Sequence, residues 1–160
     1  NRIAGNTITN SSNDGIESYG SNRMLIENNS VSDSDYHGIT ASYTSGDFPY
    51  DVQILNNVVT NSGYHGINAY QVQRILIQGN NVSNSGFGSG DVYEEEEYAY
   101  YGDGIHVEGS GGSYEYYDTL YDILSNTVTN SADDGIEVYY YDYGYSEYPS
   151  YAKEVSLYEY

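Results

Sequence analysis

The stretch ILNNVVTNSGYHGI (residues 54–67) decides the fold, because both of its halves recur along the chain. Its first half follows the pattern I-x-(G/N/S)-N-x-(V/I)-(S/T)-(N/D)-S, which occurs at residues 3–11, 26–34, 54–62, 77–85 and 123–131. Its second half, Asp or His followed by Gly-Ile, comes after every copy, at residues 14–16, 37–39, 65–67, 103–105 and 134–136. Successive first isoleucines lie 23, 28, 23 and 46 residues apart. A period of roughly 20–30 residues with short β-type segments predicts a solenoid.

Each Gly-Ile motif predicts a short strand, because apolar or small residues alternate there with polar ones. The isoleucine and the residue two positions later are expected to point into the core, and the residue between them outward. The outward column holds Glu17, Thr40, Asn68, His106 and Glu137. No segment shows a sustained i, i+3, i+4 apolar pattern, so the chain is predicted to be all-β, with about five coils of ~23 residues.

Two columns of the first half-repeat indicate how the chain turns. One column holds residues that tolerate a positive φ: Gly5, Asn28, Asn56, Gly79 and Ser125. The next column contains asparagine in every copy: Asn6, Asn29, Asn57, Asn80 and Asn126. Asparagines stacked about 4.8 Å apart are predicted to form a structural ladder, bonding amide to amide and to turn backbone.

The intervals longer than 23 residues indicate insertions at corners of a constant frame, at about residues 86–102, 109–119 and 139–152. Val155 and Leu157 match Val52 and Ile54, which predicts a further strand after the last insertion. The whole chain, 1–160, is expected to form a single β-helix domain or a segment of a longer solenoid. No capping segment is recognisable at either end of the repeat, so a longer chain and end-to-end stacking both stay open.

The insertions hold most of the 23 tyrosines of this chain of 160 residues. Rigid, amphipathic tyrosines make good contact surfaces. They are expected to contact another protein copy, to cover their own sheet, or to stack on sugar rings. The predicted binding surface consists of Tyr98, Tyr100, Tyr101, Tyr116, Tyr117, Tyr139, Tyr140, Tyr141, Tyr143 and Tyr145.

The charge balance limits the possible partners. With 24 acidic and four basic residues the formal net charge is −20, which argues against nucleic acid and against an anionic membrane surface. No apolar run approaches the roughly 18–20 residues of a membrane span, so no membrane insertion is expected. Cysteine is absent, which removes disulfides and thiolate chemistry. The chain opens on Asn1 without a signal peptide and reads as a mature form or a segment, and an extracellular or cell-surface location is expected.

These repeats resemble the right-handed parallel β-helix superfamily, the pectin-lyase-like solenoids, over essentially the whole chain apart from the insertions. The resemblance implies three short strands per coil in three parallel sheets. Members include pectate lyases, polygalacturonases, mannuronan epimerases, phage tailspikes and surface proteins, so the fold does not define the function.

The column Asp14, His37, His65, Asp103 and Asp134 is the first candidate site. Adjacent histidines flanked by carboxylates suit acid–base catalysis or a metal ion. The structural alternative is that every coil needs a polar residue before the glycine, in which case His65 is one rung of a ladder. A second candidate is His106 beside Glu137 and Glu108, unless His106 is a lone, solvent-facing histidine.

The enzyme motifs of the resembling families are incomplete here. The segments NDG (13–15), YHG (64–66) and DDG (133–135) echo polygalacturonase motifs, but each lies on the repeat. The Arg-x-Lys motif is absent, since the only lysine is Lys153, and so is the Asp-Pro-His of mannuronan epimerases. Pectate-lyase chemistry needs an arginine or lysine base, and Arg23 and Arg74 precede strands whose edge they could equally cover.

The sequence therefore predicts an extracellular structural or adhesive β-solenoid module that self-associates end to end or laterally. End-to-end stacking would make it a filament subunit. The alternative is a polysaccharide-active enzyme (lyase, hydrolase or epimerase) with His65, His37 and Asp103 as catalytic residues, or a glycan-binding module. No organic cofactor is expected, and Ca²⁺ is the ion that the acidic loops would bind. Glycosylation motifs occur at Asn10, Asn28 and Asn81.

Overall fold

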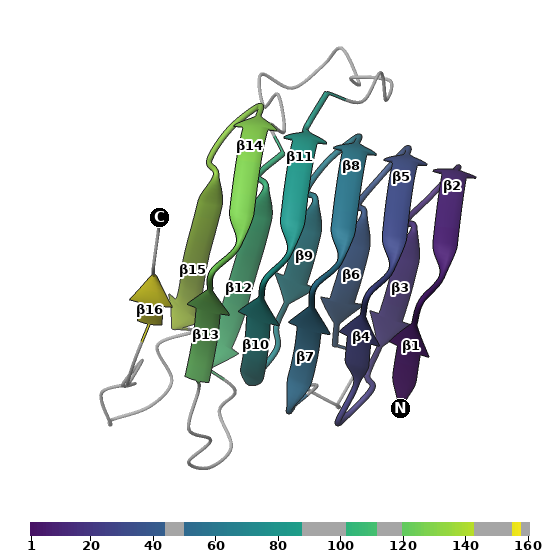
Figure 1. Cartoon of the computed structure of the whole chain (residues 1–160). Coiled ribbons are helices and arrows are strands. Elements are labelled where there is room, and N and C mark those ends of the chain that lie inside the picture. Colours follow the sequence, from purple (N-terminus) through teal and green to yellow (C-terminus); the bar gives the residue numbers. More distant parts are fainter. Residues whose placement is uncertain (44–49, 88–101, 112–119, 143–154, 158–160) are drawn as a thin grey trace.

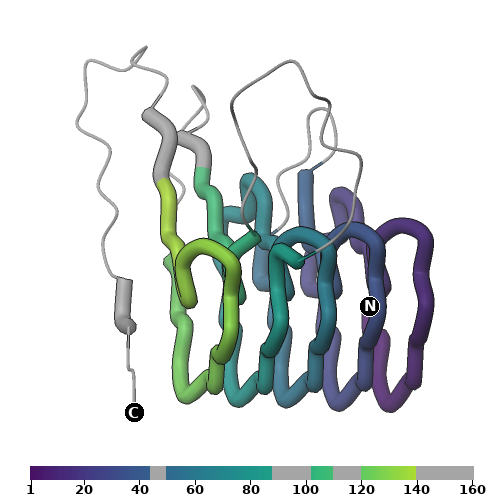
Figure 2. The backbone as a smooth tube through the Cα atoms, turned by 90° about the horizontal axis from the view of Figure 1, so that it is seen from above, coloured from purple at the N-terminus to yellow at the C-terminus, as the bar shows by residue number. Residues whose placement is uncertain are grey.

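The computed structural model describes residues 1–43, 50–87, 102–111, 120–142 and 155–157. In these ranges every regular element is a β-strand, and no helix long and apolar enough to cross a membrane is found there. The strands form three sheets, and every pairing within them is parallel. Figure 1 shows two of the sheets, called A and B below, end to end on the near side, with the third sheet, C, behind them. Figure 2 shows the flattened coils side by side.

Each coil gives one strand to each sheet, in the order A, B, C. Sheet A consists of β1 (Arg2–Ala4), β4 (Leu25–Glu27), β7 (Val52–Leu55), β10 (Arg74–Gln78), β13 (Leu120–Leu124) and β16 (Val155–Leu157). Sheet B consists of β2 (Thr7–Ser11), β5 (Ser30–Ser34), β8 (Val58–Ser62), β11 (Asn81–Ser85) and β14 (Thr127–Ser131). Sheet C consists of β3 (Ile16–Tyr19), β6 (Ile39–Ser42), β9 (Ile67–Tyr70), β12 (Ile105–Gly111) and β15 (Ile136–Asp142). Coils 1 to 5 begin with β1, β4, β7, β10 and β13.

The register between coils follows the repeat. The first isoleucines of all five copies pair in one row of sheet A: Ile3, Ile26, Ile54, Ile77 and Ile123. In β16, Val155 pairs with Tyr121 and Leu157 with Ile123, as the match to β7 predicts. The predicted all-β parallel solenoid is therefore confirmed.

The core is a set of aliphatic columns between the sheets. Ile26, Ile39, Ile54, Ile67 and Ile105 have no measurable exposure. In the first four coils the glycine before the sheet C isoleucine is needed for close packing rather than for a turn, whereas a Cβ on Gly135 in coil 5 would meet nothing within 4 Å. A Cβ on Gly38 would overlap Val59 Cγ1 and lie 2.6 Å from the Gly66 carbonyl oxygen. A larger residue there would push two coils apart.

Two columns of each coil adopt the left-handed conformation. The first is the predicted corner column, with φ of 69° at Gly5, 54° at Asn28, 53° at Asn56, 68° at Gly79 and 53° at Ser125. The second lies within the sheet B strands and holds Asn10, Asp33, Asn61, Asn84 and Asn130, with φ between 55° and 57°. Sequence analysis did not predict this second column, although its Asn and Asp residues are the types that tolerate a positive φ.

The asparagines of the corner form a continuous ladder. Each Nδ2 donates to Oδ1 of the asparagine in the next coil, at 2.9 Å for Asn6 to Asn29 and 3.0 Å for Asn29 to Asn57. The backbone N–H of each also donates to that Oδ1, as Asn29 does to Asn57 at 2.9 Å. Asn57 is 1% exposed, and its Nδ2 also donates to the Ile26 carbonyl at 3.0 Å. The ladder thus satisfies backbone groups that the corner would otherwise leave buried and unpaired.

Strands β12 and β15 continue past the positions 109 and 139 at which the sequence places two insertions. They stay paired through Glu108–Tyr139, Gly109–Tyr140 and Ser110–Tyr141 to Gly111–Asp142. The sequence places Tyr139, Tyr140 and Tyr141 in a loop, and this prediction is wrong. They are strand residues, because β12 and β15 continue to pair with each other beyond the repeat. Tyr98, Tyr100, Tyr101, Tyr116, Tyr117, Tyr143 and Tyr145 lie outside the described residues.

Asn57→Ala tests the ladder. The change leaves the backbone N–H of Asn29 without its side-chain acceptor, takes one of two acceptors from Asn29 Nδ2 and removes a donor from the Ile26 carbonyl, and each buried group left unpaired costs about 1–3 kcal/mol. We expect the free energy of unfolding in urea to fall by roughly 3 kcal/mol or more. Asn6→Ala is the matched control, since Asn6 is exposed, and should cost less than about 1 kcal/mol. Equal losses from both variants would show that burial of the ladder is not what makes it stabilising.

Candidate functional site

The Asp/His column before the glycine is itself a hydrogen-bond ladder. Asp14 Oδ1 accepts the His37 N–H at 3.1 Å, and Asp103 Oδ1 accepts the Asp134 N–H at 3.1 Å. His65 Nδ1 accepts the Asp103 N–H at 3.0 Å in the same way. Three of the four steps between coils thus use a side-chain acceptor, which a carboxylate or an unprotonated imidazole nitrogen can supply. The step from His37 to His65 lacks this bond, because His37 Nδ1 has no hydrogen-bond partner.

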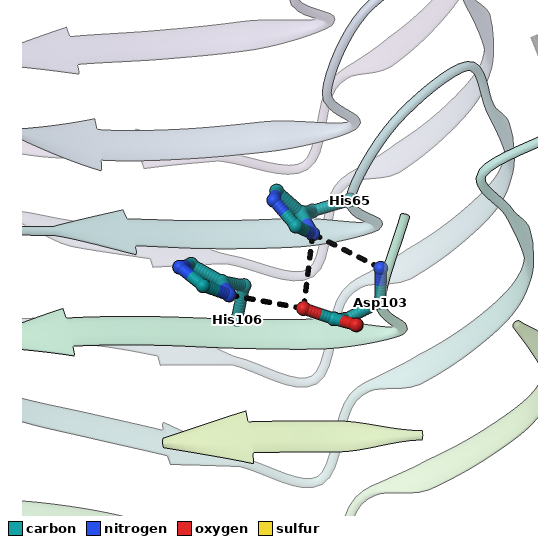
Figure 3. Close-up of side chains that lie close together, drawn as sticks. All are labelled: His65, Asp103 and His106. Atoms are coloured by element: carbon teal, nitrogen blue, oxygen red, sulfur yellow. Dashed lines mark hydrogen bonds and ion pairs between the residues drawn. The ribbon is translucent and has the colours of Figure 1, made fainter. Parts of the chain in front are cut away.

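Asp103 is the centre of a cluster that goes beyond this ladder. It is 2% exposed, and it lies in the turn that leads into β12. Its Oδ2 lies 2.9 Å from Nδ1 of His106 and 3.3 Å from Nδ1 of His65 (Figure 3). Since His65 Nδ1 already accepts a backbone N–H, the hydrogen bond to Oδ2 comes from His106.

His106 lies on β12 between carboxylates of two coils. Its Nδ1 is 2.8 Å from Oε2 of Glu137, and its Nε2 is 4.0 Å from Oε2 of Glu108. The His106 side chain is only 14% exposed. The alternative of a lone, solvent-facing histidine is therefore wrong, because Asp103 and both glutamates surround the ring. The sequence alone did not connect His106 with Asp103.

Contacts within the cluster shift the pKa values of His106 and Asp103 in opposite directions. Burial by itself lowers the pKa of His106, but the hydrogen bond to Asp103 and the nearby Glu137 outweigh burial and raise it. Burial likewise raises the pKa of Asp103, but the hydrogen bond from His106 and the nearby His65 hold it below its usual range. Burial raises the pKa of Glu108. The pair thus favours a charged Asp103 and makes His106 hold its proton more tightly than a free imidazole does.

Three histidine rings stack along the solenoid. His37 and His65 are 5.1 Å apart between ring centroids with planes 3° apart, and His65 and His106 are 4.4 Å apart with planes 16° apart. His37 Nε2 lies 3.3 Å from Asn68 Nδ2, while its buried Nδ1 has no hydrogen-bond partner. Burial, and then the charges of His65 and His106, lower the pKa of His37 to about 3. His37 is thus a neutral ring in the stack.

A groove of about 350 Å³ adjoins this stack on the outer face of sheet C. Its floor is formed by the outward column, with Glu17, Thr40 and Asn68. Four tyrosines line its sides: Tyr19, Tyr36, Tyr43 and Tyr70. Tyr43 and Tyr70 are 5.8 Å apart between ring centroids, and Tyr36 stacks on Tyr64 at 4.9 Å. The groove thus combines aromatic walls with a polar floor.

The arginines lie away from this face. Arg74 pairs with Asp51 at 3.2 Å, and Arg2 pairs with Glu27 at 2.6 Å. The Arg23 guanidinium lies 5.8 Å from the centroid of the Tyr50 ring. Arg23, Arg74 and Asp51 line a separate groove of about 430 Å³ along sheet A. The described residues therefore place no arginine beside His65 and Asp103, where a lyase of the pectate type would need one.

The sequence family is established by comparison. The family model described as the right-handed beta helix region matches residues 1–113, so the chain belongs to this family of parallel β-solenoids. No curated protein and no solved structure matches the chain. Extracellular location, self-association and calcium binding by the acidic loops stay predictions.

The protonation of His37 gives a test of the stack. Its pKa of about 3 in the folded state lies below the ~6.5 of an unfolded chain, so the unfolded state binds the proton more tightly. Stability from this residue is therefore complete above about pH 6.5 and is lost as the pH falls toward 3. We expect wild type to lose stability relative to His37→Asn over this interval, measured by urea unfolding at successive pH values. A difference that does not change with pH would contradict the buried, neutral ring.

Proposed function

We propose that the protein is a carbohydrate-binding β-solenoid, an extracellular adhesive module that holds a glycan chain on the outer face of sheet C. The observation that carries the proposal is the groove with tyrosine walls and a polar floor. Pockets for small ligands combine apolar or aromatic area with a few oriented polar groups. A pyranose ring presents the matching surface, with C–H faces for the tyrosines and hydroxyls for Glu17 and Asn68.

The walls of the groove are accessible and spread over three coils. Tyr19 in coil 1 is 53% exposed and Tyr36 in coil 2 is 49% exposed. Tyr70 in coil 3 lies in one row with Ser42 and Tyr19, whereas Tyr36 lies before β6, at the other end of that strand. Exposed aromatic rings on a rigid sheet offer contact area at a small cost in conformational entropy. The row runs along the solenoid axis, which suits a chain-like ligand.

The charge of the groove selects the kind of glycan. Asp14 and Glu17 line it, His37 is neutral, and none of the described lining residues is a lysine or arginine. A polyuronate would be repelled by these carboxylates and by the net charge of −20. The proposed ligand is therefore a neutral or amino-sugar oligosaccharide.

Glycan-array binding followed by titration calorimetry tests the proposal. We expect binding of neutral or amino-sugar oligosaccharides and at least about tenfold weaker binding by Tyr36→Ala and Tyr70→Ala, because each loses an aromatic wall worth roughly 1.4 kcal/mol or more. Phe87→Ala is the control, since Phe87 is 58% exposed but does not line the groove. Binding confined to polyuronates, or equal loss in all three variants, would contradict the proposal.

Acid–base catalysis on the bound glycan is a second candidate function. The favouring observation is His106 Nδ1, held 2.9 Å from Asp103 and 2.8 Å from Glu137. A protonated imidazole with a raised pKa is a suitable general acid, and a carboxylate beside it orients the ring. The cluster lies at the coil 4 end of the groove, since His65 stacks on His37, which lines it.

His106→Asn separates the two candidate functions. The variant places in coil 4 the residue that coil 3 carries in the same column, Asn68, so the fold should be kept. If the protein is an enzyme, turnover of the bound glycan, followed by the appearance of new sugar ends, should fall by about 10²-fold or more while binding is kept. Phe87→Ala is the control that should retain turnover, because Phe87 belongs neither to the groove lining nor to the His106 cluster. If wild type releases no product from any glycan that it binds, the catalytic candidate fails and the binding module remains.

A further inference from the structure

We propose that His65, Asp103 and His106 form a binding site for one divalent transition-metal ion, with Zn²⁺ as the expected occupant. Donor atoms of these three side chains all lie within 4.8 Å of one another, and Figure 3 shows the carboxylate between the two imidazole nitrogens. The three ligands come from coils 3 and 4 and meet where β12 begins. A carboxylate oxygen of Glu137, in coil 5, lies 2.8 Å from Nδ1 of His106.

The cluster has more lone pairs than hydrogens to share. Asp103 Oδ2 and Glu137 Oε2 both approach the single Nδ1 of His106, which carries at most one hydrogen. The lone pair of His65 Nδ1 also lies 3.3 Å from Asp103 Oδ2. A bound proton can satisfy only one of these contacts well. A divalent cation accepts electron pairs from His65, Asp103 and His106 at once, and its charge offsets those of the Asp103 and Glu137 carboxylates.

The distances between the donor atoms are close to those around a small cation. Tetrahedral zinc with bonds of about 2.0–2.1 Å places its ligand atoms about 3.3–3.4 Å apart. The His65 Nδ1–Asp103 Oδ2 distance of 3.3 Å has this length, and the His106 Nδ1–Asp103 Oδ2 distance of 2.9 Å is a few tenths of an ångström shorter.

Asp103 is held in place by the fold. Its side chain is 3% exposed, and its Oδ1 accepts the Asp134 N–H at 3.1 Å, which leaves Oδ2 to face the histidines. A carboxylate oriented by a backbone amide is the kind of outer contact that supports metal sites. The His65 and His106 side chains, 18% and 14% exposed, leave the cluster accessible to an ion from solvent.

Metal binding requires the two rings to turn. They now stack at 4.4 Å with planes 16° apart, and a shared ion must lie near the plane of both. Each ring would rotate about its Cβ–Cγ bond, and His65 Nδ1 would leave the Asp103 N–H. That neutral hydrogen bond is much weaker than a metal–imidazole bond, so the exchange favours the ion.

The donor set favours Zn²⁺ or a similar ion over Ca²⁺. Two imidazole nitrogens with one carboxylate match the ligands of zinc, whereas calcium takes six to eight oxygen ligands. The proposal does not rest on carbohydrate binding, because His65, Asp103, His106 and Glu137 do not line the glycan groove. Metal and glycan binding can therefore be measured separately on the same chain.

The test is calorimetric titration of the untagged full chain with ZnCl₂ after chelator treatment. We expect one Zn²⁺ per chain, and at least about tenfold weaker binding by His65→Asn and by His106→Asn, each of which removes one imidazole ligand. Asparagine keeps an acceptor for the Asp103 N–H at position 65. His37→Asn is the matched control, because His37 belongs to the same stack but supplies no ligand, and its affinity should equal wild type.

Absence of saturable binding would overturn the proposal, as would equal affinity in all variants or an equal loss in His37→Asn. If circular dichroism shows either ligand variant to be unfolded, the visible spectrum of wild type with Co²⁺ decides. Intense bands of tetrahedral, nitrogen-ligated cobalt support the site, and weak bands of an octahedral oxygen-ligated ion contradict it. Titration with Ca²⁺ that binds as tightly as Zn²⁺ would also overturn the assignment.

Discussion

The structure depends on the parallel, in-register pairing of each coil with the next. Neighbouring strands lie about 4.8 Å apart, so a residue in one coil has its counterpart directly above it. Each column must therefore hold residues that can stack on their counterparts in the next coil. Isoleucine meets this condition by packing, glycine by close approach, and asparagine by donating and accepting through one amide. The Asp/His column meets it with a backbone N–H and a side-chain acceptor.

This condition explains what could be predicted from the sequence. Because stacking repeats each side-chain environment, the repeat showed the strands, the isoleucine row and the strand at residues 155–157. The positive φ of Asn28 and Gly79 followed from residue type. The second left-handed column, with Asn61 and Asn84, was missed although it interrupts the alternation. The buried residues Val59 and Ser62 lie three positions apart there instead of two. The extents of β12 and β15 were missed because their added pairs hold glycine and tyrosine rather than repeat residues.

The site was only partly predictable for a related reason. His65 and Asp103 share a column, so their proximity follows from the repeat even though an insertion separates them in sequence. His106 belongs to the outward column, and it contacts Asp103, which lies three residues earlier in the same coil. Such a contact depends on side-chain rotamers, which a periodic pattern does not specify. The contact between His106 and Asp103, which the repeat does not specify, is therefore the one that gives the cluster its candidate chemistry.

The two asparagine ladders have opposite directions. In the inner ladder, amides donate toward the C-terminal coil, as Asn6 does to Asn29, and the backbone N–H groups that share each Oδ1 fix this sense. In the outer ladder Asn61 donates to Asp33, Asn84 to Asn61 and Asn130 to Asn84. Asp33 can only accept, so its carboxylate sets the orientation of every amide after it. The side-chain dipoles of the two rows therefore oppose each other, and the solenoid can lengthen by whole coils without accumulating an electric moment from its amides.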